Sequence, residues 1–202
     1  MDAFFSQLSS YNLLNYLLPG VIFSFIAHKF WAVGWLKDAN DLEKIFIWYF
    51  LGLFISRIGS LYIEPYLRKN GYIKFADYKE FIKASKADKS LKELSEINNT
   101  FRTMLALFLV TCVISLVKFL SIINAEMSVK YIFNILLDRA EPLCFSPIMI
   151  YIFYTSYKKQ TKYIYDRIYA DLNNDNGWCR IFLIRLNEYY FITGGFAIWL
   201  MK

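Results

Sequence analysis

The sequence predicts an all-α integral membrane protein with about four transmembrane helices and a small helical cytoplasmic region. Two observations lead to this class. Hydrophobic residues make up 57% of the 202 residues, above the 45–50% that is usual in soluble domains. They are gathered in runs of about 20, the length of helix needed to cross roughly 30 Å of hydrocarbon.

Four apolar windows predict the membrane spans: 13–35, 45–67, 104–123 and 143–157. The fourth is short and would borrow length from the helix that follows it. A further apolar segment, 181–201, contains Arg185 and Glu188, so it is either an interfacial helix folded back on the membrane or a fifth span.

The charge of the connections predicts the orientation. Lys and Arg crowd the connection between the second and third windows and the segment after the fourth, whereas the other connections are poor in them. Because basic loops stay in the cytoplasm, both the middle connection and the C-terminal part are expected there. The chain then divides into 1–67 with two spans, a basic helical loop at 68–103, two spans at 104–157, and a cytoplasmic helix with the terminal segment at 158–202.

The middle connection has helical periodicity of its own. Ser90 and Glu93 form the pattern of a capping box, and the helix that starts there is expected to run directly into the third span. Tyr163, Ile164 and Ile168 continue the apolar stripe of the fourth span into the cytoplasm. These stripes predict a small cytoplasmic helical unit, packed on itself or on a neighbouring subunit.

Two sets of lysines are candidate ligand-binding residues. Within each set the spacing places most of the side chains on one helix face. The sets either form a solvated face near anionic lipid or bind an anionic ligand such as a nucleotide or oligonucleotide. They are Lys79, Lys83 and Lys86, and Lys158, Lys159 and Lys162.

Charges inside the apolar windows are the other candidates. Arg57 lies in the middle of the second window, where a charge is costly and usually faces a partner or water. The same helix carries Ser56 and Ser60 at the spacing that lets helices approach closely, and Glu64 on the same face. Lys118 lies toward the outer end of the third window. These five residues line a pore or an interface; the alternatives are a structural Arg57–carboxylate pair and, for Lys118, snorkelling to the surface.

Catalytic and metal-binding patterns are missing from the sequence. Its three cysteines are widely separated, His28 is the single histidine, and no Gly-rich phosphate loop or HExxH motif occurs. We therefore expect neither an enzyme nor a bound cofactor or metal.

Three stretches carry a resemblance to a known group. They are NYLLPG at 15–20, ISRIGSLYIEP at 55–65, and FADYK at 75–79 with LSEINN at 94–99. Together they resemble small multi-span membrane effectors of bacterial anti-phage defence, most of all the channel subunit of the Hailong system and secondly the membrane subunit of the Kiwa system. The resemblance covers about the first half of the chain.

The resemblance implies a homotetrameric anion channel in the bacterial inner membrane that acts in abortive infection. It also implies a nucleotidyltransferase partner whose oligonucleotide product holds the channel shut from the cytoplasm. The alternative function is a non-conducting membrane scaffold or sensor that recruits a cytoplasmic partner.

Overall fold

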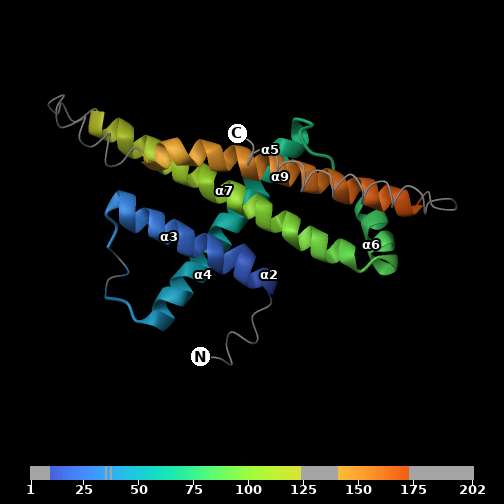
Figure 1. Ribbon diagram of the computed structural model, residues 1–202, viewed down its shortest axis with the longest axis horizontal. Coiled ribbons are helices and arrows are strands. Elements are labelled where there is room, and N and C mark those ends of the chain that lie inside the picture. Colours follow the sequence, from blue (N-terminus) through green and yellow to red (C-terminus); the bar gives the residue numbers. More distant parts are fainter. Residues whose placement is uncertain (1–9, 35, 37, 124–140, 173–202) are drawn as a thin grey trace, which may run out of the picture.

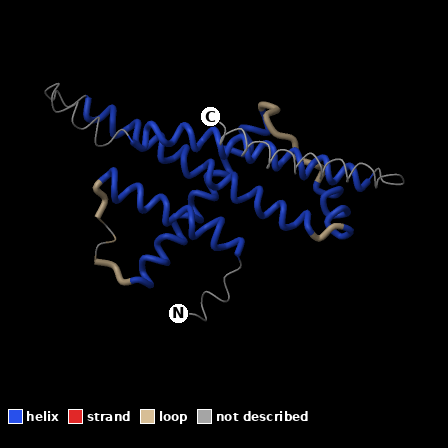
Figure 2. The backbone as a smooth tube through the Cα atoms, viewed as in Figure 1, coloured by secondary structure: helices blue, strands red, loops and turns tan. Residues whose placement is uncertain are grey.

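The computed structural model describes residues 10–34, 36, 38–123 and 141–172, and this part of the chain is helical, without strands (Figures 1 and 2). The elements are α2 (Ser10–Asn12), η1 (Leu13–Leu17), α3 (Leu18–Trp31), α4 (Asp41–Ile58), η2 (Gly59–Ile63), α5 (Glu64–Lys69), α6 (Tyr78–Ala87), α7 (Ser90–Ile123) and α9 (Glu141–Leu172).

Three helical segments of the described chain are long and apolar enough to cross a membrane: Leu13–Trp31, Asp41–Lys69 and Ser90–Ser121. They confirm the first three predicted windows and the all-α membrane class. The predicted segment at 181–201 lies outside the described residues.

The first span ends earlier than predicted. Ala32 adopts a left-handed conformation, with φ of 54°, and its N–H caps the helix on the carbonyl of Ala27. This closure ends the helix at Trp31, and Trp35, the predicted end, lies outside the described residues.

The second span starts four residues before its predicted window. The Asn40 side chain accepts a hydrogen bond from the N–H of Glu43, and the Glu43 carboxylate accepts one from the N–H of Asn40. This capping box satisfies two backbone donors that a helix start leaves open. From there α4, η2 and α5 form one continuous run to Lys69.

The helix predicted to run from the cytoplasmic loop into the third span is present as the 34 residues of α7. Its start differs from the predicted capping box. The Asp88 carboxylate accepts hydrogen bonds from both the N–H and the hydroxyl of Ser90, at 3.0 and 2.7 Å. An aspartate two residues upstream thus does what was expected of the Ser90–Glu93 pair.

The expected fourth span is part of α9, which runs unbroken through the predicted cytoplasmic stripe to Leu172. However, α9 does not join the three membrane-crossing candidates. Its apolar stretch, 143–157, reaches about 22 Å at 1.5 Å per residue, short of the roughly 30 Å of hydrocarbon, before Lys158 and Lys159 follow. The count of spans is therefore three in the described chain, not four.

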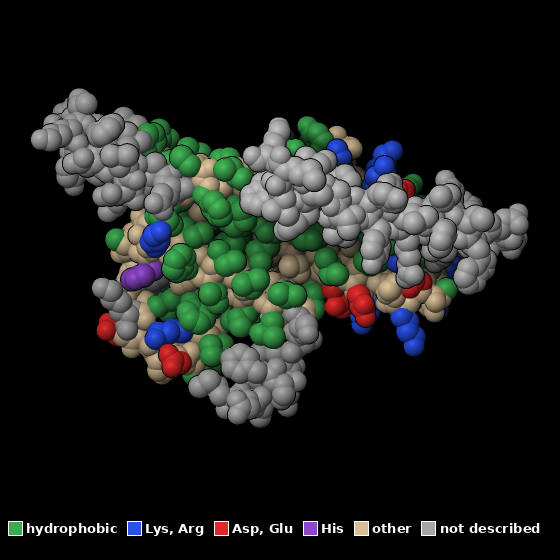
Figure 3. Space-filling model, in the orientation of Figure 1, with side chains coloured by type: hydrophobic (Ala, Val, Ile, Leu, Met, Phe, Trp, Pro, Cys, Tyr) green, Lys and Arg blue, Asp and Glu red, His purple; other side chains and the backbone are tan. Residues whose placement is uncertain are grey.

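Packing explains the position of α9. It lies beside α7 along most of its length (Figure 1), and its Met149, Ile150 and Phe153 contact a core formed by Leu107 and Phe108 of α7. At the other end, Ala84 of α6 packs with residues of α7 and α9. Figure 3 shows hydrophobic side chains over the middle of the molecule and charged ones toward its ends, as expected of a membrane protein.

Candidate functional site

Two glycines set how closely the first two spans cross. A Cβ on Gly20 would lie 1.7 Å from the carbonyl oxygen of Trp48, and a Cβ on Gly52 would lie 1.6 Å from that of Tyr16. Each glycine therefore faces the backbone of the other span. This reciprocal contact fits the role that small residues have in membrane helix pairs.

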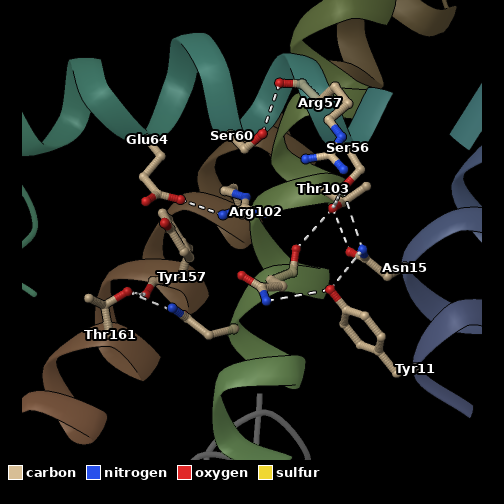
Figure 4. A network of polar contacts seen from close by, with 12 residues as sticks. Tyr11, Asn15, Ser56, Arg57, Ser60, Glu64, Arg102, Thr103, Tyr157 and Thr161 are labelled. Carbon is tan, nitrogen blue, oxygen red and sulfur yellow. Dashed lines mark hydrogen bonds and ion pairs between the residues drawn. The ribbon is translucent and has the colours of Figure 1, made fainter. Parts of the chain in front are cut away.

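Beside this crossing lies a buried polar cluster that joins the first three spans (Figure 4). Asn15, with no exposed surface, accepts a hydrogen bond from the Thr103 hydroxyl at 2.7 Å. Its amide nitrogen donates to the hydroxyls of Tyr11 and Ser56, at 3.2 and 3.4 Å. The Thr103 and Ser56 hydroxyls lie 3.1 Å apart. We refer to Tyr11, Asn15, Ser56 and Thr103 as the Asn15 cluster.

A second polar group joins α5, α7 and α9. Glu64 forms an ion pair with Arg102, and the buried Tyr157 lies beside both (Figure 4). The side chains of Arg102 and Glu64 are 13% and 27% exposed. The sequence placed Glu64 on the helix face of Arg57. The partner of Glu64 is instead Arg102, which the sequence assigned to the basic loop at 68–103.

Arg57 itself is exposed in the single chain. Its side chain forms no ion pair or hydrogen bond with any described residue, and its backbone carbonyl accepts from Ser60. Apolar side chains surround it on the same face of α4: Phe50, Phe54 and Leu61 are each more than 60% exposed. The Arg57–carboxylate pair within one subunit is therefore not formed among these residues.

The packing also relates Arg57 to the other two spans. Its neighbour Ser56 contacts Asn15 and Thr103, which stand near the starts of the first and third predicted windows. Arg57 is central in its own window, whereas these contacts belong to the starts of the other two. The second span is longer, and α4 crosses α3 steeply in Figure 1.

The other candidates within the spans have local contacts. Ser56 belongs to the Asn15 cluster, while Ser60 donates to its own helix. Lys118 donates to the carbonyl of Trp31 at 3.3 Å, and its ammonium lies 5.8 Å from the centre of that indole ring. Lys118 thus caps the end of α3, which agrees with the snorkelling alternative.

The two lysine sets occupy outward faces of two helices. Lys79, Lys83 and Lys86 are exposed on the side of α6 opposite Phe81 and Ala84, which face the core shared with α7 and α9. Lys158, Lys159 and Lys162 are exposed on the side of α9 opposite Tyr157 and Thr161. The two lysine sets are connected through the helices that carry them, α6 and α9. The contacts described above include none that joins a lysine of one set directly to a lysine of the other.

An ion pair stabilises the packing of α6, α7 and α9 at this end of the molecule. Arg167 of α9 lies 2.6 Å from the Asp88 carboxylate at the turn between α6 and α7. Burial of Asp88 opposes its ionisation, but hydrogen bonds from Ser90 and the charge of Arg167 outweigh burial and lower the pKa of Asp88. The turn that starts α7 is thereby attached to the far end of α9.

The sequence did not reveal the Asn15 cluster or the pairing of Arg102 with Glu64. A sequence signal was present for the Asn15 cluster. Asn15 stands inside an apolar run, and Asn99 and Thr103 share one helix face with the spacing of four that leads toward it. A polar side chain in such a run usually has an intramembrane hydrogen-bond partner.

Comparison of the chain with protein-family models, curated proteins and solved structures found no match.

Proposed function

We propose that this protein is a subunit of an oligomeric, anion-permeable membrane channel of a bacterial anti-phage defence system. The observation that carries the proposal is the exposed Arg57 on an otherwise apolar, exposed face of α4. A guanidinium facing lipid is costly, and such residues usually face a neighbouring protein surface or a watery cavity. A second copy of the chain at this face would supply either one.

The position of Arg57 determines what it would do in such an assembly. Because its neighbour Ser56 contacts Asn15 and Thr103, a ring of Arg57 side chains would surround a shared path toward the end that the predicted orientation places in the cytoplasm. Positive rings favour anions. Lys118, which caps α3, is no longer needed to explain selectivity.

The gate would lie on the cytoplasmic lysines. An anion bridging α6 and α9 would hold these two helices together. Asp88, in the turn between α6 and α7, already pairs with Arg167 of α9, and both α7 and α9 continue toward the membrane. A ligand with different affinities for the closed and open arrangements shifts the balance between them. The resemblance at 15–20 and 55–65 supports an oligonucleotide made by a partner nucleotidyltransferase as the ligand, and a homotetramer in the inner membrane.

Planar-bilayer recording of the purified protein tests conduction. The parent is expected to conduct anions, and Arg57→Glu should reverse or abolish the anion preference. Lys69→Glu, the same charge change at the exposed end of α5, is the matched control and should keep the preference. An Arg57→Glu channel with unchanged selectivity would exclude Arg57 from the path. An intact oligomer that stays silent under all ligands would favour the alternative, a scaffold or sensor that recruits a cytoplasmic partner.

Binding of a short 5′-phosphorylated oligonucleotide tests the gate. Joint replacement of Lys79, Lys83 and Lys86 by Glu should abolish binding, and parent binding should weaken steeply with salt. The matched control reverses three other exposed lysines of the same connection, Lys74, Lys89 and Lys92. If the first triple variant binds as well as the parent, these lysines are only a surface near lipid.

A further inference from the structure

A hollow lies between α3 and α4 at the end of the molecule away from the cytoplasmic lysines. The two helices touch at Gly20 and Trp48 and separate toward Trp31 and Asp41 (Figure 1). The hollow has a volume of about 380 Å³, within the range of roughly 300–1,000 Å³ found for small-molecule sites. Its helical lining residues are Val21, Ser24, Phe25, His28, Lys44 and Trp48.

Sequence spacing explains why these side chains meet. The four residues from α3 stand at i, i+3, i+4 and i+7, and the two from α4 at i and i+4, so each set covers one helix face. The glycine contact forms the narrow end. The divergence of the helices leaves a wedge that apolar side chains line and basic side chains close at the wide end.

The polar groups of the hollow are mainly hydrogen-bond donors. Lys44 supplies an ammonium and His28 an imidazole. The indole N–H of Trp48 is buried and has no hydrogen-bond partner among the described residues, although tryptophan N–H groups usually find one when buried. Because the Nε1 atom of Trp48 is buried, this group makes no contact in the hollow, and the basic side chains of Lys44 and His28 supply the charged donors.

One acid stands at the rim. Asp41 accepts a hydrogen bond from Lys44 at 3.4 Å, and its side chain is 82% exposed. An exposed pair of this kind is weak, so the Lys44 ammonium can turn to an anion in the hollow. His28 is also exposed, as the purple side chain at the surface in Figure 3 shows.

The surroundings indicate how a ligand would enter. Phe25, a lining residue, is 63% exposed and belongs to a membrane-crossing helix. The hollow therefore borders the hydrocarbon on one side and the basic rim on the other. An apolar chain could lie along Val21 and Phe25 while its head reaches Lys44 and His28.

We infer that this hollow is a binding site for an anionic amphiphile with one acyl chain seated between α3 and α4. The head is a phosphate or carboxylate that accepts from Lys44 and His28. A membrane lipid and a free fatty acid share this chemistry. The site is separate from Arg57 and from the cytoplasmic lysines, so it stands without the proposed channel function.

Photo-crosslinking of the full chain in phosphatidylcholine nanodiscs tests the inference. Two probes are used in parallel, each carrying a diazirine in its acyl chain: phosphatidylglycerol and dodecanoate. Mass spectrometry of the labelled peptides is expected to place the label on residues 21–28 or 44–48, and excess unlabelled probe should suppress it. Labelling by phosphatidylglycerol alone identifies a lipid site, and labelling by dodecanoate alone identifies a site for a free amphiphile.

Charge variants make the test specific. The double change His28→Gln and Lys44→Gln should lower labelling in this region about tenfold, the effect of losing roughly 1.4 kcal/mol of binding free energy. Lys29→Gln, one residue along α3 and outside the lining, is the matched control and should label like the parent. Equal labelling of the double variant and the parent, or label spread evenly over the exposed apolar faces with both probes, overturns the inference. The parent's label position and its suppression decide the question even if the double variant fails to fold.

Discussion

At the scale of single residues, the absence of a side chain is as important here as its presence. Gly20 and Gly52 each lie against a carbonyl of the facing helix, and the backbones at this crossing could not approach so closely with any larger residue. The Asn15 cluster lies beside this contact and depends on it, since Asn15 and Ser56 come from the two helices that the glycines bring together.

Gly52→Ala should therefore destabilise the fold. The new Cβ would meet the Tyr16 carbonyl at 1.6 Å, so one backbone must move, at a cost on the order of 1–3 kcal/mol. Thermal unfolding of the detergent-solubilised protein measures this. The control is Gly59→Ala, whose nearest neighbour is the Ala106 Cβ at 3.3 Å; a smaller or absent shift is expected. Equal shifts in the two variants would show that the crossing is looser than described.

The Glu64–Arg102 pair gives a second prediction at this scale. Glu64→Gln should cost roughly 3 kcal/mol, because it leaves the largely buried guanidinium of Arg102 without its counter-charge. Adding Arg102→Met should cost less than the sum of the single changes, since contacting residues are not additive. Chemical unfolding of all four proteins in a double-mutant cycle gives the coupling. Arg68→Gln, exposed one helical turn from Glu64, is the control; full additivity would refute the pair.

Which charges would pair could not be predicted from the sequence. Spacing along one helix placed Glu64 on the face of Arg57, but the π-helical turn Gly59–Ile63 lies between them, and Glu64 pairs with Arg102 while Arg57 is exposed. The packing of η2 against α7 brings Arg102 to Glu64. The contact of Lys118 with the Trp31 carbonyl was likewise not predicted, because it depends on which helix end lies beside α7.

At the scale of helices, α7 and α9 each run without a break from their apolar stretch to the end that packs with α6. Buried contacts between them continue beyond the apolar run, as in the Thr161 hydroxyl that donates to the Asn98 side chain at 3.2 Å. The turn before α7 is then held to α9 by Asp88 and Arg167. The three helices α6, α7 and α9 are thus held together at this end of the molecule.

The Asp88–Arg167 contact predicts a pH dependence of this attachment. Because the folded-state pKa of Asp88 is lowered, its stabilisation is present above the unfolded value of about 3.9 and is lost as pH falls through the lowered pKa. Asp88→Asn should therefore lower the stability at pH 7 by roughly 0.5–1 kcal/mol, as the pair is partly exposed. Thermal unfolding at pH 7 and pH 3 measures this.

The difference between parent and Asp88→Asn should shrink at pH 3, because Asp88 of the unfolded chain is protonated below about 3.9 and folding then has to release that proton to form the ion pair. Asp166→Asn, an exposed acid on α9, is the control and should show a smaller difference at pH 7. A difference between parent and Asp88→Asn that grows on acidification would contradict the lowered pKa.

Helix existence and continuity were readable from the sequence, but local geometry was not. The periodicity at 90–101 and 163–172 predicted the extended helices correctly. In contrast, the π-helical turns at Leu13–Leu17 and Gly59–Ile63 have no sequence pattern of their own. They arise where tertiary contacts add a residue to a turn, and they adjoin the Asn15 and Glu64 contacts.

At the scale of the whole molecule, the ends of the helices fall into two groups. The turns around α6 lie with the far end of α9, whereas the ends of α3 and α7 at Trp31 and Lys118 lie together at the opposite end.

Reporter fusions test the predicted orientation. A fusion after Asn70 should give a cytoplasmic signal, because the connection that follows is rich in lysine, and a fusion after Asp38 should give a signal from the other side. Pairs of reporters active on opposite sides of the membrane provide the control at each site. An external signal after Asn70 would reverse the orientation, and the lysine sets would then face away from any cytoplasmic ligand.

The number of spans was the part of the architecture that composition overstated. The window at 143–157 is apolar, but it is too short to cross the membrane. Its apolar side chains pack on α7 instead. Hydropathy does not separate an apolar stretch that faces lipid from one that faces a neighbouring helix, so a short run of this kind reads as a span.

The glycine crossing has a consequence for the order in which the protein assembles during synthesis. Gly20, Trp48, Tyr16 and Gly52 all belong to the first two spans, so this helical hairpin has its closest contact before the third span is made. Ser56 and Tyr11 are also in place by then as partners for Asn15. The third span is made later, and we expect its Thr103 hydroxyl to dock on the Asn15 amide oxygen, with the hairpin of the first two spans as the template for the remaining helices.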